Sequence, residues 1–154
     1  MAALAHVQDA VLKADGAVLR YGWFYGPGAL DELVAIVRKR QFPLVGAAQG
    51  RCSWVHVDDA ARATVLAVEQ RAKGVFNIVD DEPAPVAVWL PALARELGAK
   101  PPRHVPAWLA RLLIGEHGVT MMTDARGSSN SKAKRELGWT LRYPTWRVGF
   151  AEGL

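Results

Sequence analysis

The stretch Val18–Gly28, VLRYGWFYGPG, decides the fold because it begins as a strand and ends as a glycine-rich loop. The apolar run Ala17 to Leu19 is typical of a strand that is buried on both faces. Three glycines and a proline between positions 22 and 28 then prevent that strand from continuing. The sequence therefore predicts a buried strand with a loop at its carboxyl end.

Four large aromatic residues fall in the same stretch, where a solvent-exposed connection would normally be polar: Tyr21, Trp23, Phe24 and Tyr25. In open parallel sheets, ligands bind outside the carboxyl ends of the strands, so an aromatic loop there is placed to form a pocket wall. A small aromatic cluster that closes a core would account for the same residues. The local sequence leaves both interpretations open.

Composition limits the classes of protein to which the chain can belong. The 154 residues are 51% hydrophobic, which suffices for one domain with a real core. The net charge of +4 comes from scattered residues, so helix faces explain it better than nucleic-acid binding. The single cysteine, Cys52, excludes an intramolecular disulfide and a cysteine-built metal site, and it fits a reducing, cytoplasmic setting. We expect neither a signal peptide nor a membrane span.

Hydrophobic spacing predicts helices and strands that alternate along the chain. The strand, helix, strand order over 53–79 is typical of a parallel sheet, and Asp58 or Asp59 is expected to cap its helix. Residues 121–130 are expected to be irregular. Helices are predicted over 3–14, 31–40, 60–73, 86–97, 107–114, 131–137 and 144–154, and strands over 17–19, 53–57 and 75–79.

Four stretches, in this order, resemble the C-terminal half of the extended short-chain dehydrogenase/reductase family, the NAD(P)-dependent epimerases and dehydratases. They cover nearly the whole chain. The stretches are LRYGWFYGPG at 19–28, SWVHVDDAARA at 53–63, GVFNIVDDEP at 74–83 and SNSKAKRELGW at 129–139.

The resemblance implies an α/β fold, made of the last two strands of a Rossmann-like parallel sheet and a mostly helical substrate-binding lobe. It assigns residues 1–28 and 53–80 to the end of the cofactor domain. Residues 29–52 and 81–154 would form the lobe. The intact family fold binds NAD or NADP, and the choice between them is normally made at the second strand, which has no counterpart here.

Two family features are missing from the sequence. No G-x-x-G-x-x-G or G-x-G-x-x-G turn is present to approach a pyrophosphate. The family also uses a tyrosine four residues before a lysine, whereas Tyr21, Tyr25 and Tyr143 precede Tyr25, Ala29 and Arg147 at that spacing. The first helix resembles the end of the helix that carries this pair. We therefore expect no catalytic residue in this chain and weak or no cofactor binding by the chain alone.

The resemblance also implies a set of binding residues. Cofactor contacts would come from Tyr21, Gly22, Trp23 and Phe24, and substrate contacts from Trp23, Tyr25, Cys52 and Trp54. The family's nucleotide-sugar enzymes usually carry asparagine where this chain has Trp23 and arginine where it has Cys52, and Arg51 is expected to face the other way. A smaller or more apolar substrate than a nucleotide sugar is therefore expected.

Other polar residues have structural explanations beside functional ones. His56 matches a family position that is chiefly structural, and Asp58 and Asp59 lack enough nearby partners to form a metal site. Arg126 and the polar residues at 128–130 have two readings, either wrapping an anionic group or capping the helix at 131–137. No metal site is expected.

The strand at 17–21 has no second neighbour among the remaining predicted strands. Its open edge would expose unpaired amides and carbonyls beside apolar surface. We therefore expect either a homo-oligomer or a separate polypeptide that completes the sheet. The chain as a whole is interpreted as the substrate-binding portion of an NAD(P)-dependent enzyme that is inactive alone, or as a non-catalytic binding or interaction module.

Overall fold

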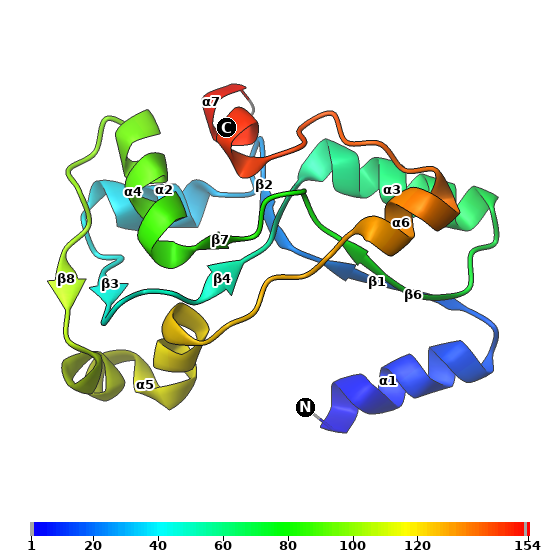
Figure 1. Ribbon diagram of the computed structural model, residues 1–154, viewed down its shortest axis with the longest axis horizontal. Helices are drawn as coiled ribbons and strands as arrows, with labels where there is room; N and C mark the ends of the chain where they lie inside the picture. Colours follow the sequence, from blue (N-terminus) through cyan, green and yellow to red (C-terminus); the bar gives the residue numbers. More distant parts are fainter. Residues whose placement is uncertain (1, 153) are drawn as a thin grey trace.

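The computed structural model describes residues 2–152 and 154, and helices and short strands alternate along them (Figure 1). In chain order the elements are α1 (Ala2–Lys13), β1 (Ala17–Tyr21), β2 (Trp23–Tyr25), α2 (Asp31–Arg38), β3 (Leu44–Val45), β4 (Arg51–Cys52), β5 (Trp54–His56), α3 (Val57–Glu69), β6 (Gly74–Ile78), β7 (Ala84–Pro85), α4 (Val86–Glu96), β8 (His104–Val105), α5 (Ala107–Thr123), α6 (Ser131–Leu137) and α7 (Trp146–Glu152). The α/β class predicted from the sequence is confirmed.

The two longest strands form a parallel pair at one end of the molecule. β1 lies beside β6, in a register that places Ala17 opposite Gly74 and Tyr21 opposite Ile78. Helices α3 and α6 lie over one face of this pair and α1 lies on the other side (Figure 1). The two strands and their covering helices are the part of a doubly wound sheet that the sequence predicts.

The chain changes its strand partner at Gly22. The Gly22 amide still donates to the carbonyl of Ile78 on β6, at 3.0 Å, but the next amide, of Trp23, donates to the carbonyl of Ser53, at 2.8 Å. From there β2 runs parallel to β5. A Cβ atom at position 22 would lie 2.5 Å from the Ser53 oxygen, so only glycine allows the two segments to approach this closely.

Strand β5 separates two hydrophobic cores, because both of its faces are buried. Trp54 faces the core of the lobe, whereas Val55 faces the core beneath α3 and α6. The lobe core is aromatic, with the Trp54 ring at 4.9 Å from the Trp89 ring and 5.3 Å from the Phe150 ring, both edge-on. One strand of three residues thus contributes a side chain to each core.

The lobe is built from helices that are joined by very short strand pairs. β3 runs parallel to β8, and β4 runs antiparallel to β7. Helices α2, α4 and α7 lie together at the opposite end from β1 and β6 (Figure 1). Helix α5 is two helical segments joined at Gly115, where φ is 71° and the backbone is not helical.

Several strand predictions need correction. β1 is half-buried to exposed, not buried on both faces, because it pairs with β6 alone among the described residues. Part of the predicted loop after it is the strand β2. The 53–57 segment does not alternate between core and solvent, since all three residues of β5 are buried. β5 and β6 do not pair with each other; each pairs with a different part of 17–25.

The predicted cap of helix α3 is also wrong. The Nδ1 atom of His56 accepts the Asp58 amide at 3.1 Å, so His56 caps the helix and neither aspartate does. The fully buried Asp59 carboxylate instead accepts the amides of Arg142 and Tyr143, at 2.8 and 2.9 Å. The Tyr143 ring stacks on the His56 ring at 3.9 Å. These contacts attach the C-terminal segment to the start of α3.

The helix predictions agree with the structure more closely. Each predicted helix is present with ends that differ by a few residues, and α6 ends at Gly138 in the left-handed conformation, as its glycine indicates. The exception is α5, which continues beyond position 114 and absorbs the start of the segment expected to be irregular. The sequence predicted an end at position 114 because glycines such as Gly115 and Gly118 are typical of a helix break.

We predict that Asp59→Ala destabilises the fold far more than Asp58→Ala. Removing the buried Asp59 carboxylate leaves two backbone amides without acceptors, which costs about 2 to 4 kcal/mol in the free energy of unfolding. The Asp58 side chain is 58% exposed and lies 3.8 Å from its closest ionic partner, so its loss should cost less than about 0.5 kcal/mol. Chemical denaturation of both variants measures the difference; equal losses would contradict the buried anchoring role.

Candidate functional site

A cleft of about 440 Å³ opens at the carboxyl ends of β1 and β6. Its first wall is the turn from β1 into β2, and its second wall is the segment that joins β4 to β5. The carboxyl end of β6 forms the floor. The lining residues are Arg20, Tyr21, Gly22, Trp23, Arg51, Cys52, Ser53, Asn77, Val79, Met121, Ala125, Arg126 and Ser128.

The third wall is the crossing segment after α5, and backbone hydrogen bonds hold it in place. The amide of Gly50 donates to the Met122 carbonyl at 2.9 Å, and the amide of Arg51 donates to the Ala125 carbonyl at 2.7 Å. The Ser53 hydroxyl accepts the amide of Ser128 at 2.8 Å. Although this segment has little regular structure, its position beside the strand ends is therefore fixed.

The structure brings together only some of the binding residues predicted from the sequence. Tyr21, Gly22, Trp23 and Cys52 all line the cleft. Phe24 is 42% exposed but packs on Tyr21, with ring centroids at 5.4 Å, outside the cleft lining. Tyr25 and Trp54 have no exposed surface and belong to the lobe core. The binding roles of all these residues remain predictions.

The two aromatic rings of the cleft are held from behind. The Tyr21 hydroxyl is hydrogen-bonded to the Thr64 hydroxyl at 2.6 Å. Trp23 packs edge-on against Trp54 at 5.5 Å and Trp89 at 6.1 Å. Tyr21 and Trp23 remain 37% and 39% exposed, so each presents a fixed apolar surface to a ligand.

Cys52 offers little chemistry in this position. Only 5% of its surface is exposed, and burial raises the pKa of its thiol. A thiol that stays protonated is a poor nucleophile. Cys52 is therefore a small apolar contact in the cleft wall.

The cleft also carries positive charge, from arginines that lie far apart in the sequence. Arg20, Arg51 and Arg126 line it, and none of its lining residues is an aspartate or glutamate. We expected Arg51 to face away from the position of Cys52. In the structure Arg51 is the exposed residue of β4 and Cys52 the buried one, yet both reach the cleft. Of the three arginines, only Arg126 is marked in the sequence, as a candidate anion contact before the helix at 131–137.

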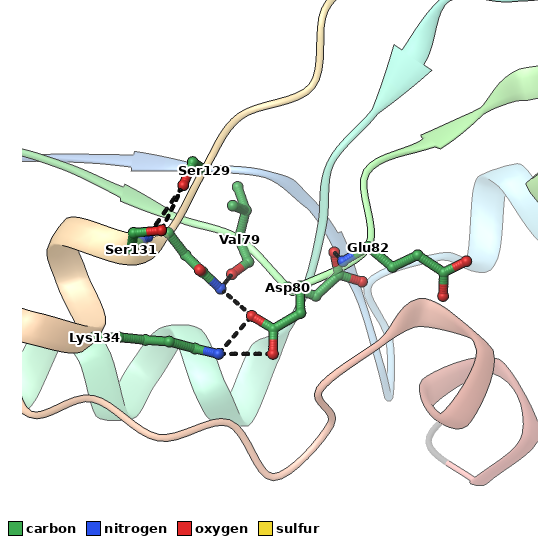
Figure 2. A network of polar contacts seen from close by, with 8 residues as sticks. Val79, Asp80, Glu82, Ser129, Ser131 and Lys134 are labelled. Carbon is green, nitrogen blue, oxygen red and sulfur yellow. Dashed lines mark hydrogen bonds and ion pairs between the residues drawn. The ribbon is translucent and has the colours of Figure 1, made fainter.

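A second polar region lies at the end of β6 (Figure 2), and its lining shares Ser128 with the cleft. The Asn130 amide donates to the Val79 carbonyl at 2.8 Å and to the Asp81 carboxylate at 2.7 Å. The Lys134 ammonium donates to both oxygens of Asp81, at 2.6 and 2.7 Å. Asn130 makes no side-chain cap for α6, so these contacts fasten α6 to the sheet instead.

Asp80 is the one carboxylate in this region that is buried without full pairing. It is 1% exposed; one oxygen accepts the amide of Glu82 at 3.3 Å, and the other has no partner among the described residues. Burial raises the pKa of Asp80 from its ordinary value of 3.8 to about 7. Burial likewise raises the pKa of the Tyr25 hydroxyl, and the charges of Asp80 and Asp59 add to that effect.

The fold and the cleft define a class: a parallel α/β sheet of Rossmann type with a cleft at its strand ends, the edge where ligands of such sheets bind. The sequence profile described as the NAD dependent epimerase/dehydratase family matches residues 2–79. The chain belongs to this family. It is also 46% identical over 153 residues to a Streptomyces protein named 3-diazoavenalumate denitrifying reductase. The match covers 96% of this chain and 50% of that protein, so the chain spans about half the length of that relative.

Solved structures share the fold. A human epimerase family protein with NADPH superposes with a TM-score of 0.76 at 20% identity, covering 88% of this chain and 47% of that chain. The dTDP-glucose 4,6-dehydratase of Bacillus anthracis, in complex with NAD, superposes with a TM-score of 0.70 at 20% identity, covering 97% of this chain and 47% of that one. The predicted Rossmann-like architecture is thus confirmed, and structures of this fold hold NAD or NADPH.

None of the helices in the described part of the chain has the length and apolar character needed to cross a membrane. Within residues 2–152, no three His, Cys, Asp or Glu side chains lie together in a way that could hold a metal ion.

We predict that Asp80→Asn changes the pH dependence of stability. Because the pKa of Asp80 is higher in the folded state, its contribution to stability is complete below about pH 4 and is lost as the pH rises through about 7. Asparagine cannot ionise, so the variant should gain up to about 4 kcal/mol relative to the wild type between pH 4 and 8. Denaturation across this range measures the difference in unfolding free energy, with exposed Asp58→Asn as the control. A difference that stays constant with pH would contradict the burial argument.

Proposed function

We propose that this chain is the substrate-binding C-terminal portion of an NAD(P)-dependent reductase of the epimerase/dehydratase family. The observation that carries the proposal is the aromatic, arginine-bearing cleft at the carboxyl ends of β1 and β6. Ligands of open α/β sheets bind at that edge. The 46% identity to a denitrifying reductase favours reduction over epimerisation.

The residues present fit one end of a dinucleotide and not the other. We propose Tyr21, Gly22, Trp23 and Phe24 as cofactor contacts; the first three line the cleft, and Phe24 packs on Tyr21 outside the cleft lining. The sequence has no glycine-rich turn for a pyrophosphate and no tyrosine four residues before a lysine. When bound, the cofactor would supply the hydride. This chain's own share is to orient the substrate and exclude water.

The substrate that we propose is a small organic molecule held between Trp23 and the wall that carries Cys52. The Streptomyces relative is named for a diazo-substituted carboxylate. The three arginines of the cleft suit an anion of that kind. A cytoplasmic setting and the absence of a nucleic-acid partner belong to the same proposal.

We also propose that the cofactor-binding half of the family fold, or a second copy of this chain, covers the open side of β1. Among the described residues β1 has no neighbouring strand except β6. On α1, which packs next to β1, Leu4 and Val7 are 71% and 58% exposed. An unpaired strand edge and an uncovered apolar helix face both favour association.

The test is a hydride-transfer assay. The 154-residue chain alone should not oxidise NADH or NADPH in the presence of a diazo-substituted carboxylate, because it lacks the proton-transfer pair and the pyrophosphate contacts. Calorimetric titration of the same chain should show NAD and NADP binding weaker than about 1 mM.

Addition of the N-terminal half of the Streptomyces relative should restore oxidation of the nicotinamide cofactor. Turnover or micromolar cofactor affinity of the 154-residue chain alone would contradict the proposal. A folded complex of the two halves that binds cofactor but never transfers hydride would favour the alternative, a non-catalytic binding or interaction module.

A further inference from the structure

We propose that the cleft binds the carboxylate of a small, flat aromatic acid, and that Arg126 is the residue that pairs with the anion. This inference rests on the proposed function, because it takes the cleft to be the substrate site. It adds the chemical class of the ligand and the residue that selects it.

The lining of the cleft is positively charged. Its lining contains three arginines and no acidic residue, so the positive charge is not neutralised within the site. Some surface arginines outside the cleft have an acidic partner, such as Arg147 with Glu82 and Arg111 with Glu116, each at 2.8 Å, whereas the three arginines of the cleft have none among the described residues. An anionic ligand would supply the missing partner.

The three arginines are not equivalent. The guanidinium of Arg20 donates to the Gln8 side chain at 2.9 and 2.6 Å, and Arg51 donates to the Pro83 carbonyl at 2.9 Å. Arg126 makes no hydrogen bond or ion pair with any described residue, although the backbone beside it is fixed through Arg51 and Ser128. Its planar group is thus available for two parallel hydrogen bonds to a carboxylate.

The apolar surface of the cleft favours a ligand that contains a flat ring. Tyr21 and Trp23 present aromatic faces that are anchored from behind, so little side-chain entropy is lost when a flat ligand packs on them. The volume of about 440 Å³ lies at the lower end of the range for small-molecule sites. A ring joined to a carboxylate uses both the aromatic wall and the cation.

The test uses cinnamate as the probe and the 154-residue chain itself. Calorimetry should show that cinnamate binds at least about tenfold more tightly than its methyl ester, which has the same ring but no charge, and than acetate, which has the charge but no ring. Arg126→Gln should abolish the preference for the acid over the ester. Arg71→Gln, an exposed arginine at the amino end of β6, is the matched control and should leave it unchanged.

Three outcomes would overturn the inference: equal binding of cinnamate and its ester, tighter binding of phenyl phosphate than of cinnamate, or no binding of cinnamate up to about 10 mM. A second basic surface provides a further check, because Arg38, Lys39, Arg40, Lys100 and Arg103 line another cleft. A loss of cinnamate binding in Arg103→Gln equal to that in Arg126→Gln would place the anion there and reject the proposal.

A second pair of variants tests the aromatic wall of the cleft. Trp23→Ala should weaken cinnamate binding by about tenfold, whereas Trp108→Ala, a tryptophan that is 65% exposed outside the cleft, should not change it. Thermal unfolding of both variants shows whether they remain folded. Equal effects would remove Trp23 from the site. Because these measurements need no hydride transfer, their failure is distinct from failure of the proposed reductase function.

Discussion

The structure depends on one close contact between backbones, at Gly22. There the strand from Ala17 to Tyr25 leaves β6 and joins β5, and the space beside the Ser53 carbonyl admits no Cβ atom. This change of partner lets one continuous segment belong to both the sheet and the lobe. It also turns Tyr21 and Trp23 toward the same cleft, with Ser53 and Asn77 as the neighbouring walls. The candidate site follows from this geometry.

The two cores differ in composition, and the lobe core is the one that contacts Trp23 of the cleft. The core beneath α3 and α6 is mostly small and aliphatic, which lets the helices pack closely on β6. The lobe core is built from edge-on aromatic rings around Trp54. Because Trp23 packs on Trp54 and Trp89, the cleft wall is supported by the aromatic core of the lobe. The arginines, in contrast, reach the cleft from segments at its margin.

Much of the fold could be predicted from the sequence, and the failures have physical causes. Helices were predicted because apolar spacing and glycine stops are local signals, as at Gly138. The strand β2 was missed because its pairing depends on the distant β5, and the roles of His56 and Asp59 depend on Tyr143 and its neighbours. In the site, Trp23 was identified from its loop, whereas the grouping of Arg20, Arg51 and Arg126 required three-dimensional proximity. The proposed domain boundaries remain predictions.

We propose that β1 is an edge to be covered by a partner, and the mass of the chain in solution tests this proposal most directly. Size-exclusion chromatography with light scattering, across a dilution series, should give a mass above the 16.8 kDa of one chain. Dilution should then reduce that mass and weaken cooperative unfolding, because the exposed edge and the apolar face of α1 lose their cover. A stable, cooperatively folded species of 16.8 kDa at low micromolar concentration would contradict the account.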